Sequence, residues 1–417
     1  MTNLFALGGM IGPAYLVGAI PSLIEHMPPS LRCWIGSDEP EQATRVHRGF
    51  FGAWIVAMPF AGWLADGSSL AASMAIGAFG MAICWSLLAF KAPRRSEAFF
   101  FGGLGFFYAC MTIATLASFP TLLDATDRSP EALCWGYVVV GIGMLTGPAL
   151  VARIEKWIGC RGTLSMMAVV SLMPLLVLFG WEEPVRKVAE IDMWTDPAFW
   201  LGLLALALYF PAETCIESWA RPFLADLGYS ERRLAIRLAG FWGMFLFGRF
   251  IFGFVRTGWE GAVLAVAALL CASLLGNVRG TYQNRAGTWG LWLAGLTFGP
   301  ILPGLLGLLL GFYPETPGMI LGVALGISGL HHAFLEPWLA EKARQTSPRE
   351  ALRLPLALLL VSSVPMLLAA ALNPNPQYPP TRVRGGDANM KAENPPPKKG
   401  RLWKLVNWFR KPANKAQ

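Results

Sequence analysis

Residues 62–73 read GWLADGSSLAAS, a short polar interruption with a single charge, Asp66. No charged residue occurs from 49 to 65 before it, or from 67 to 90 after it. Each of these two runs is long enough to cross the hydrocarbon core of a bilayer, about 30 Å thick, as an α-helix. The stretch therefore predicts a tight turn between two membrane-spanning helices.

The composition extends this prediction to the whole chain. Hydrophobic residues make up 54% of the 417 residues and charged residues 14%, with a mean hydropathy of +0.47. Soluble domains carry about 25% charge, so we expect an integral membrane protein. The seven cysteines lack CxxC or Cys/His spacing and indicate neither a disulfide framework nor a metal site. The first span begins almost at Met1 without a positive segment before it, so we expect no removable signal peptide.

Charge-free runs predict ten spans, and two interrupted apolar runs add two more. The ten runs are 1–24, 49–65, 67–90, 98–123, 132–152, 162–181, 261–278, 286–314, 316–335 and 354–381. The interrupted runs, roughly 197–219 and 236–256, contain Glu213, Glu217, Arg237 and Arg249. Because the runs are continuous and do not alternate over about ten residues, they favour helices over barrel strands. We predict an all-α membrane protein with twelve transmembrane helices.

A long polar connection divides these spans into two sets of six. It gives four predicted parts: a six-helix bundle at 1–181, a central cytoplasmic loop at 182–196, a second bundle at 197–372 and a basic tail at 373–417. A nearly constant offset relates Pro21 to Pro211, Gly52 to Gly243, Gly62 to Gly253 and Pro148 to Pro337. We therefore expect two pseudo-symmetric bundles. Secondary transporters are commonly built in this way, with the substrate site at the midplane between the repeats.

Several short motifs, in this order, resemble the major facilitator superfamily. The turn from Gly62 through Asp66 resembles the family pattern G-x-x-x-D-R-x-G-R-R, and the run from Gly141 through Gly147 and Pro148 is similar to its glycine-proline helix motif. Three stretches of the second half resemble the fucose permease-like branch of this family. They are YFPAE at 209–213 with ESW at 217–219, FWG at 241–243 with Gly248 and Arg249, and GPILP at 299–303. The resemblance covers residues 1 to about 372. It implies a transporter with both termini in the cytoplasm of the plasma (inner) membrane.

The sequence departs from the family pattern at two places. The basic residues that should follow Asp66 are replaced by Gly67, Ser68 and Ser69, which thins the charge network that braces one gating state in the family. Two interpretations of this turn remain open. Asp66 or Ser68 serves only as the N-cap of the third span, or Asp66 makes a gating contact in addition to capping. The first span has no acid before Glu25, which puts the family's usual coupling residue in doubt.

Charged groups within hydrocarbon are costly and tend to mark a transport pathway. Glu213 and Glu217 share one helical face of the seventh span, after the helix-breaking Pro211. They predict a substrate or proton site, and the resemblance implies a cavity-facing acid at Glu213. Alternatively, Glu217 lies at the outer interface and pairs with Arg221. Arg249 either pairs with an acid across the two halves or extends to the membrane surface.

A second polar cluster occurs in the eleventh span, at His331, His332 and Glu336. It predicts a proton relay, with hydrogen-bonded packing as the alternative. A metal site is disfavoured because no third ligand is evident in the sequence. Hydroxyl groups that could line a path for a polar solute belong to Tyr15, Tyr108, Thr112 and Thr115.

These features predict a secondary transporter that moves a small polar solute, sugar-like or another organic metabolite, by alternating access with proton coupling. The alternative is a non-transporting receptor or assembly protein of the same fold. No P-loop, zincin or nucleophile-elbow motif is present, so we expect neither an enzyme nor a pump that uses a nucleotide, and no cofactor. We expect a monomer.

The tail and the loop charges bear on orientation. Residues 400–411 form a basic amphipathic pattern after a Pro-rich linker and predict binding to acidic lipids; no module for nucleic acid accompanies them. With the termini inside, 19 Lys and Arg residues would lie in outer loops, against five in inner loops and ten in the tail. This distribution conflicts with the positive-inside rule, and the resemblance favours cytoplasmic termini.

Overall fold

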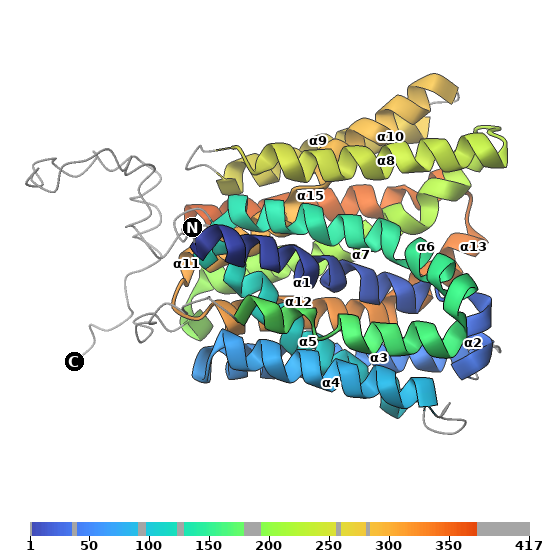
Figure 1. Cartoon of the computed structure of the whole chain (residues 1–417). Helices are drawn as coiled ribbons and strands as arrows, with labels where there is room; N and C mark the ends of the chain where they lie inside the picture. The colour runs from blue at the N-terminus through green and yellow to red at the C-terminus, as the bar shows by residue number, and fades with distance from the viewer. Residues whose placement is uncertain are drawn as a thin grey trace, which may run out of the picture.

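The structure, a computed structural model, describes residues 2–35, 40–90, 97–122, 129–178, 193–255, 260–280 and 284–372, most of which lie in helices joined by short turns (Figure 1). The first half contains α1 (Thr2–Glu25), α2 (Pro29–Ile35), α3 (Pro40–Gly67), α4 (Leu70–Phe90), α5 (Glu97–Leu122), α6 (Ser129–Val170) and η2 (Met173–Leu178). The second half contains η3 (Met193–Thr195), α7 (Pro197–Asp226), α8 (Glu231–Phe252), α9 (Glu260–Gly280), α10 (Asn284–Phe298), α11 (Ile301–Phe312), α12 (Pro317–Leu330), η4 (His331–Leu335), α13 (Glu336–Gln345), α14 (Pro348–Ala351) and α15 (Arg353–Ala371).

The predicted fold class is confirmed: the described helices form twelve membrane spans. Ten helical segments are long and apolar enough to cross a bilayer, and Gly9–Glu25 of α1 is a shorter apolar helix. The segment Pro130–Leu176 holds two spans, because 47 residues of helix would measure about 70 Å. These two spans meet at Gly159, whose φ of 71° is a left-handed conformation that glycine adopts readily.

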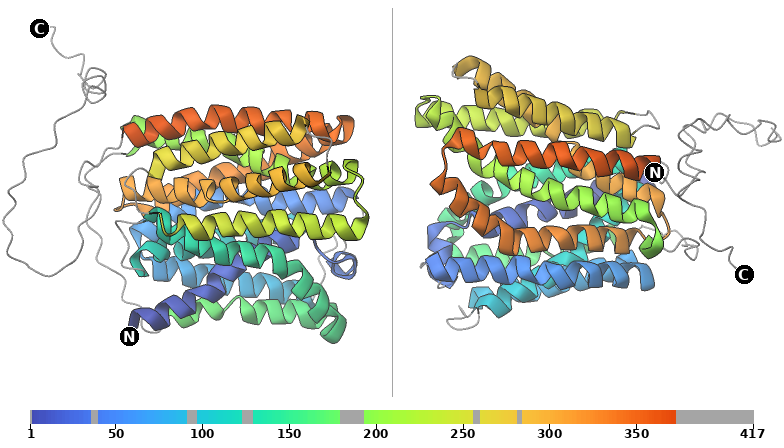
Figure 2. Two further views of the ribbon diagram at one scale, coloured as in Figure 1. Left: turned by 90° about the horizontal axis from the view of Figure 1, so that it is seen from above. Right: turned by 180° about the vertical axis from the view of Figure 1, so that it is seen from behind.

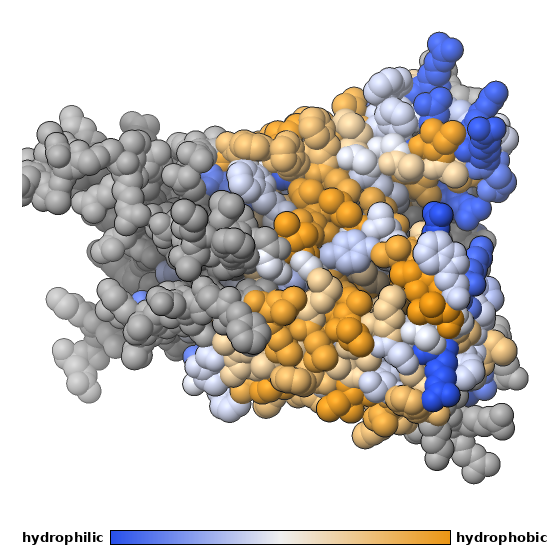
Figure 3. All heavy atoms as spheres, viewed as in Figure 1, coloured by the Kyte–Doolittle hydropathy of each residue, from blue (hydrophilic) through white to orange (hydrophobic). Residues whose placement is uncertain are grey.

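The helices run side by side between two faces of the molecule. On the terminal face, α1 begins, α3 turns into α4 and α15 ends; on the opposite loop face lie α2, α13 and the connection between α7 and α8 (Figures 1 and 2). Apolar side chains form a band across the middle, and hydrophilic side chains gather at the loop face (Figure 3). Most of the predicted central loop and all of the predicted basic tail lie outside the described residues.

Small residues let helices of the two halves approach closely. α3 packs along α12, and α6 packs along α11 and α8. At the crossing of α3 and α12, a Cβ added to Gly62 would clash with the carbonyl oxygen of Gly318. Lipid tails are as apolar as leucine, so close packing of this kind, more than a hydrophobic difference, holds membrane helices together.

Two irregularities interrupt the spans of the second half. Between α10 and α11, Gly299 and Pro300 break the tenth span, because proline has no amide to donate to the helix. Between α12 and α13, η4 is a single π-helical turn in which the amide of Glu336 donates to the carbonyl of His331.

Candidate functional site

A cavity of about 440 Å³ lies between the two halves. Its lining comes from both sides, from α1, α3, α5 and α6 in the first half and from α7, α8, α11, α12 and η4 in the second. On α1 it extends from Val17 to Glu25 and His26, where the helix ends at the loop face. The cavity therefore reaches from the centre of the molecule toward the loop face.

An acid and a base face each other at the bottom of this cavity. Glu213 of α7 and Arg249 of α8 both line it, with Glu213 Oε1 3.9 Å from Arg249 Nη2. The Glu213 side chain is 21% exposed, whereas that of Arg249 is 2% exposed. At 3.9 Å the two groups are paired electrostatically without a hydrogen bond. The carboxylate can therefore gain or lose a proton without breaking such a bond to the guanidinium.

Arg249 uses its hydrogen bonds to join the halves. Its Nε donates to the carbonyl of Gly299 at 3.0 Å, and its Nη1 donates to the carbonyl of Tyr137 on α6 at 3.1 Å. Its guanidinium also lies over the ring of Phe245, 4.2 Å from the centroid. Of the two readings that the sequence left open for Arg249, extension to the membrane surface is wrong, because the side chain is buried. Its acidic neighbour, Glu213, lies in its own half.

Asp66 links the same two halves at the terminal face. Its carboxylate accepts the backbone amides of Gly318 at 2.9 Å and Met319 at 2.6 Å, at the start of α12. These amides belong to the first turn of a helix, where the helix provides no acceptor and the dipole favours negative charge. The cap of the third span comes from Ser69, which accepts the amide of Ala72, whereas the Ser68 hydroxyl donates to Leu64. The contact agrees with the gating reading of Asp66.

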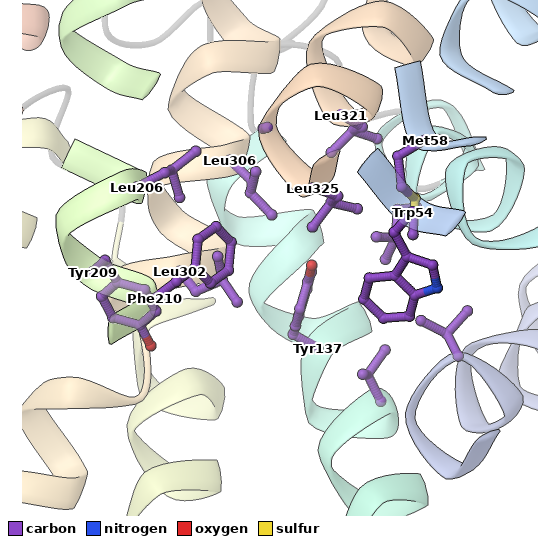
Figure 4. Close-up of a cluster of buried hydrophobic side chains, with 14 of the residues drawn as sticks. Trp54, Met58, Tyr137, Leu206, Tyr209, Phe210, Leu302, Leu306, Leu321 and Leu325 are labelled. Atoms are coloured by element: carbon purple, nitrogen blue, oxygen red, sulfur yellow. The ribbon is translucent and has the colours of Figure 1, made fainter. Parts of the chain in front are cut away.

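Aromatic rings form one wall of the cavity. Trp54 of α3 stacks on Tyr108 of α5, with ring centroids 5.2 Å apart and an interplanar angle of 12°. The Tyr108 hydroxyl donates to the carbonyl of Val17, which fixes the ring against α1. Figure 4 shows Trp54, Tyr137 and Phe210 converging on the space between the halves, from α3, α6 and α7. Such a wall offers flat apolar surfaces with few polar groups, as is typical of small-molecule sites.

The predicted cluster of the eleventh span is brought together by the π-helical turn. His332 Nδ1 lies 2.7 Å from Glu336 Oε2, and His331 Nε2 lies 2.6 Å from the Thr214 hydroxyl of α7. The ring of His332 packs on Phe51, with centroids 4.8 Å apart, and His332 lines the cavity. His47 of α3 donates from Nε2 to the His332 carbonyl. Of the three cluster residues, His332 therefore lines the same cavity as Glu213.

Of the remaining predicted residues, some line the cavity, some make packing contacts, and one has a side chain that the structure does not describe. Thr112 and Pro148 line the cavity, and Tyr15 bonds to Thr146 in the contact between α1 and α6. The side chain of Glu217 lies outside the described part of the chain. Arg221, its suggested partner, pairs with Glu231 at 2.9 Å.

Two predicted motif glycines are packing contacts. A Cβ on Gly147 of α6 would lie 2.7 Å from that of Ala19, and one on Gly248 of α8 would clash with the carbonyl of Leu296. These glycines allow α1 to approach α6, and α8 to approach α10.

Four residues of the site were missed by the sequence reasoning: Trp54, Tyr137, His47 and Thr214. An aromatic residue within an apolar run looks like any core residue, so nothing distinguished Trp54 or Tyr137. Thr214 had a usable signal, because it directly follows Glu213 in a largely apolar span.

Several known proteins similar to this chain are named as transporters. No family model matches the sequence. Two curated proteins, both named glucose/galactose transporter and from Brucella abortus biovar 1 (strain 9-941) and Brucella abortus (strain 2308), are 24% identical over 330 residues. The matches cover 69% of this chain and 80% of each relative.

Three solved structures share the fold. The transporter FucP of the major facilitator superfamily, in its outward conformation, is 14% identical with a TM-score of 0.70, over 88% of this chain and 99% of that one. A variant of the E. coli fucose:proton symporter FucP is 15% identical, with the same TM-score and coverage. The human organic anion transporter MFSD10 (TETRAN) is 16% identical with a TM-score of 0.62, over 89% and 98%. All of these proteins are named as transporters or symporters, which agrees with the expectation that the chain is not an enzyme.

Proposed function

We propose that this chain, an integral membrane protein with the fold of the major facilitator superfamily, moves a small uncharged polar solute of the sugar class by proton-coupled alternating access. The observation that carries the proposal is the cavity between the two halves, with the Glu213–Arg249 pair at its bottom. A cavity that reaches the loop face, together with contacts that close the terminal face, is the arrangement expected of one of two alternating states.

The chemistry of the cavity supports an uncharged solute. The opposite charges of Glu213 and Arg249 compensate each other, so the bottom of the cavity offers no net charge to attract an ion. Trp54 and Tyr108 supply flat apolar surface on which the apolar face of a sugar ring can pack, while hydroxyl and carboxylate groups nearby can accept or donate hydrogen bonds. The names of the curated relatives and of FucP point to sugars as the class to test.

Proton coupling is assigned first to Glu213 and next to the His332–Glu336 pair. Glu213 lines the cavity, 3.9 Å from the buried guanidinium of Arg249. It can change its charge without losing a hydrogen bond to that guanidinium. His332 lines the cavity and lies 2.7 Å from the Glu336 carboxylate, so the pair can pass protons between Glu213 and water. Protonation of Glu213 would remove the attraction that holds Arg249 beside α7, and would thereby couple proton uptake to movement of the halves.

Orientation, membrane and assembly complete the proposal. We assign both termini to the cytoplasm of the plasma (inner) membrane and the loop face to the outside, on the likeness to the transporter fold. The chain would act as a monomer, and its tail at 373–417 would bind acidic lipids of the inner leaflet.

The test is uptake by the purified protein in lipid vesicles. Labelled glucose, galactose, fucose and a set of other small metabolites are offered with and without a pH gradient. We expect uptake of at least one sugar, increased several-fold by a gradient. Binding of a sugar without any uptake would favour a receptor of the same fold, and uptake that ignores the gradient would refute proton coupling.

A further inference from the structure

We propose that His331, His332 and Glu336 form a binding site for a transition-metal ion of the Zn²⁺ class. Each of the three side chains offers one ligand atom, and these atoms lie within 4.8 Å of one another. Two imidazoles and one carboxylate are a ligand set that Zn²⁺ accepts, with a fourth position left for water. The site goes beyond transport and does not depend on which solute the chain carries.

The π-helical turn is what makes this ligand set possible. In a regular α-helix, side chains one position apart point in different directions, and residues five apart do not lie above one another. In η4 the amide of Glu336 bonds to the carbonyl of His331, so the widened turn places Glu336 above both His331 and His332. Single π turns of this kind occur frequently at functional sites.

His331 carries the strongest indication of a missing ligand. Its side chain is 4% exposed, and its Nδ1 has no hydrogen-bond partner among the residues that the structure describes. A buried nitrogen without a partner costs about 1–3 kcal/mol, so such an atom calls for an explanation. A metal ion bound at Nδ1 would supply the missing partner.

Thr214 supports the same assignment from the other side of the ring. Its hydroxyl oxygen lies 2.6 Å from His331 Nε2, so it can accept the Nε2 proton and leave a bare lone pair at Nδ1. Histidine ligands of metal ions commonly donate their second N–H to an oxygen in this manner, which fixes the tautomer and the orientation of the ring. Thr214 would therefore be a positioning residue.

The geometry requires only small movements. Ligand atoms around a tetrahedral Zn²⁺ are about 3.4 Å apart, so shifts of about 1 Å in side chains that already touch would close the site. An ion can enter from the cavity, because His332 lines it. The Glu336 side chain is also accessible, since one quarter of it is exposed. The bound ion would take the place of the proton shared by His332 and Glu336.

A binding titration tests the proposal without any measurement of transport. The chain contains only four histidines, so a protein purified without a histidine tag has few competing sites. Cys33, which is exposed, is changed to Ser to remove a possible thiolate ligand. Co²⁺ is added while its visible absorption is followed, and it is then displaced by Zn²⁺. We expect one ion per chain, with the intense absorption of a four- or five-coordinate site.

Substitutions then identify the ligands. We expect His331→Ala, His332→Ala and Glu336→Gln each to weaken Zn²⁺ binding at least tenfold, and Thr214→Val to weaken it about tenfold. His26→Ala is the matched control, because His26 is an exposed histidine at the cavity mouth, on α1, and should leave affinity unchanged. Thermal melting shows that each variant is folded. Absence of binding in the parent protein, binding that survives all three ligand substitutions, or equal loss in His26→Ala would overturn the proposal.

Discussion

Asp66 of α3 and Gly318 of α12 lie 252 positions apart in the chain and are joined by a 2.9 Å hydrogen bond from the Gly318 amide to the Asp66 carboxylate. Together with the bond from Met319, this contact ties the two halves at the terminal face. A helix terminus is a suitable partner for a gate, because its amides are already oriented and unbonded within the helix. The contact between the halves is therefore made to backbone amides and needs no basic side chain.

The first prediction concerns this gate. Asp66→Asn keeps one acceptor oxygen and turns an NH₂ group toward the second amide, so it should weaken the closed terminal face by about 2 kcal/mol, or roughly 30-fold in the ratio of closed to open. Spin-label distances between Ser68→Cys and Pro314→Cys report the opening. Asp196→Asn is the control, because Asp196 also accepts a backbone amide but within the start of its own helix, α7. Unchanged distances in Asp66→Asn would show that the gate rests on other contacts.

The second prediction concerns Glu213 and Arg249. Arg249→Gln leaves two carbonyls with a poorer donor and Glu213 beside no cation, so it should cost about 3–5 kcal/mol of stability. The double variant Arg249→Gln, Glu213→Gln should recover a substantial part of that loss, because the unpaired charge is removed. Thermal melting of the four proteins in detergent gives the coupling between the two sites. Additive losses would mean that the 3.9 Å pair contributes nothing.

A third prediction ranks the two candidate proton sites. Glu213→Gln should leave the protein folded and abolish the response of uptake to a pH gradient, because glutamine cannot exchange a proton. Glu25→Gln, at the mouth of the same cavity, is the matched control and should respond normally. If Glu213→Gln responds normally while His332→Ala does not, the proton site belongs to the eleventh span and the ranking proposed here is reversed.

The fourth prediction concerns the aromatic wall. Trp54→Ala removes the ring that stacks on Tyr108 and should raise the KM for the transported solute about tenfold, the effect of losing about 1.4 kcal/mol of binding. Trp54→Phe should recover most of the affinity. The control is Trp63→Ala, at a position of α3 that is 59% exposed on the outer surface. A change in maximal rate without a change in KM would place Trp54 outside the binding step.

The fifth prediction tests orientation. Cys33 is exposed on α2 at the loop face, so an impermeant thiol reagent should label it from outside intact cells. In a Cys33→Ser background, Ser68→Cys on the terminal face should react only after the cells are opened. The reverse pattern would show that the arginine-rich loop face lies in the cytoplasm, as the positive-inside rule requires.

Much of the fold was predictable because the bilayer imposes a length on every span. Charge-free runs located the helices, and even the close pair joined at Gly159 was separated correctly into runs 132–152 and 162–181. The π-helical turn at His331 was not predictable, since helical periodicity over five residues does not reveal one additional residue in a turn.

The site was less predictable because its contacts join distant parts of the chain. The acid at Glu213 and the cluster at His331 could be found, as charged and polar groups within apolar runs are conspicuous. The hydrogen-bond partners of Asp66 and Arg249 could not be predicted. Both side chains bond to backbone groups, which carry no sequence signal. Burial of Arg249 follows from packing of α8 against α6 and α10, which no local pattern encodes.

Arg249 also constrains the order in which the protein can be assembled. During synthesis, the carbonyl of Tyr137 precedes Arg249 by 112 residues, whereas that of Gly299 follows it by 50. When α8 enters the bilayer, the carbonyl of Tyr137 is therefore already available to Arg249, whereas that of Gly299 has not yet been synthesised. An unpaired guanidinium in hydrocarbon is costly, so early docking of α8 on α6 shelters it. The two halves would thus begin to associate before the second one is complete, and a ribosome-bound chain ending after α9 should already show that contact.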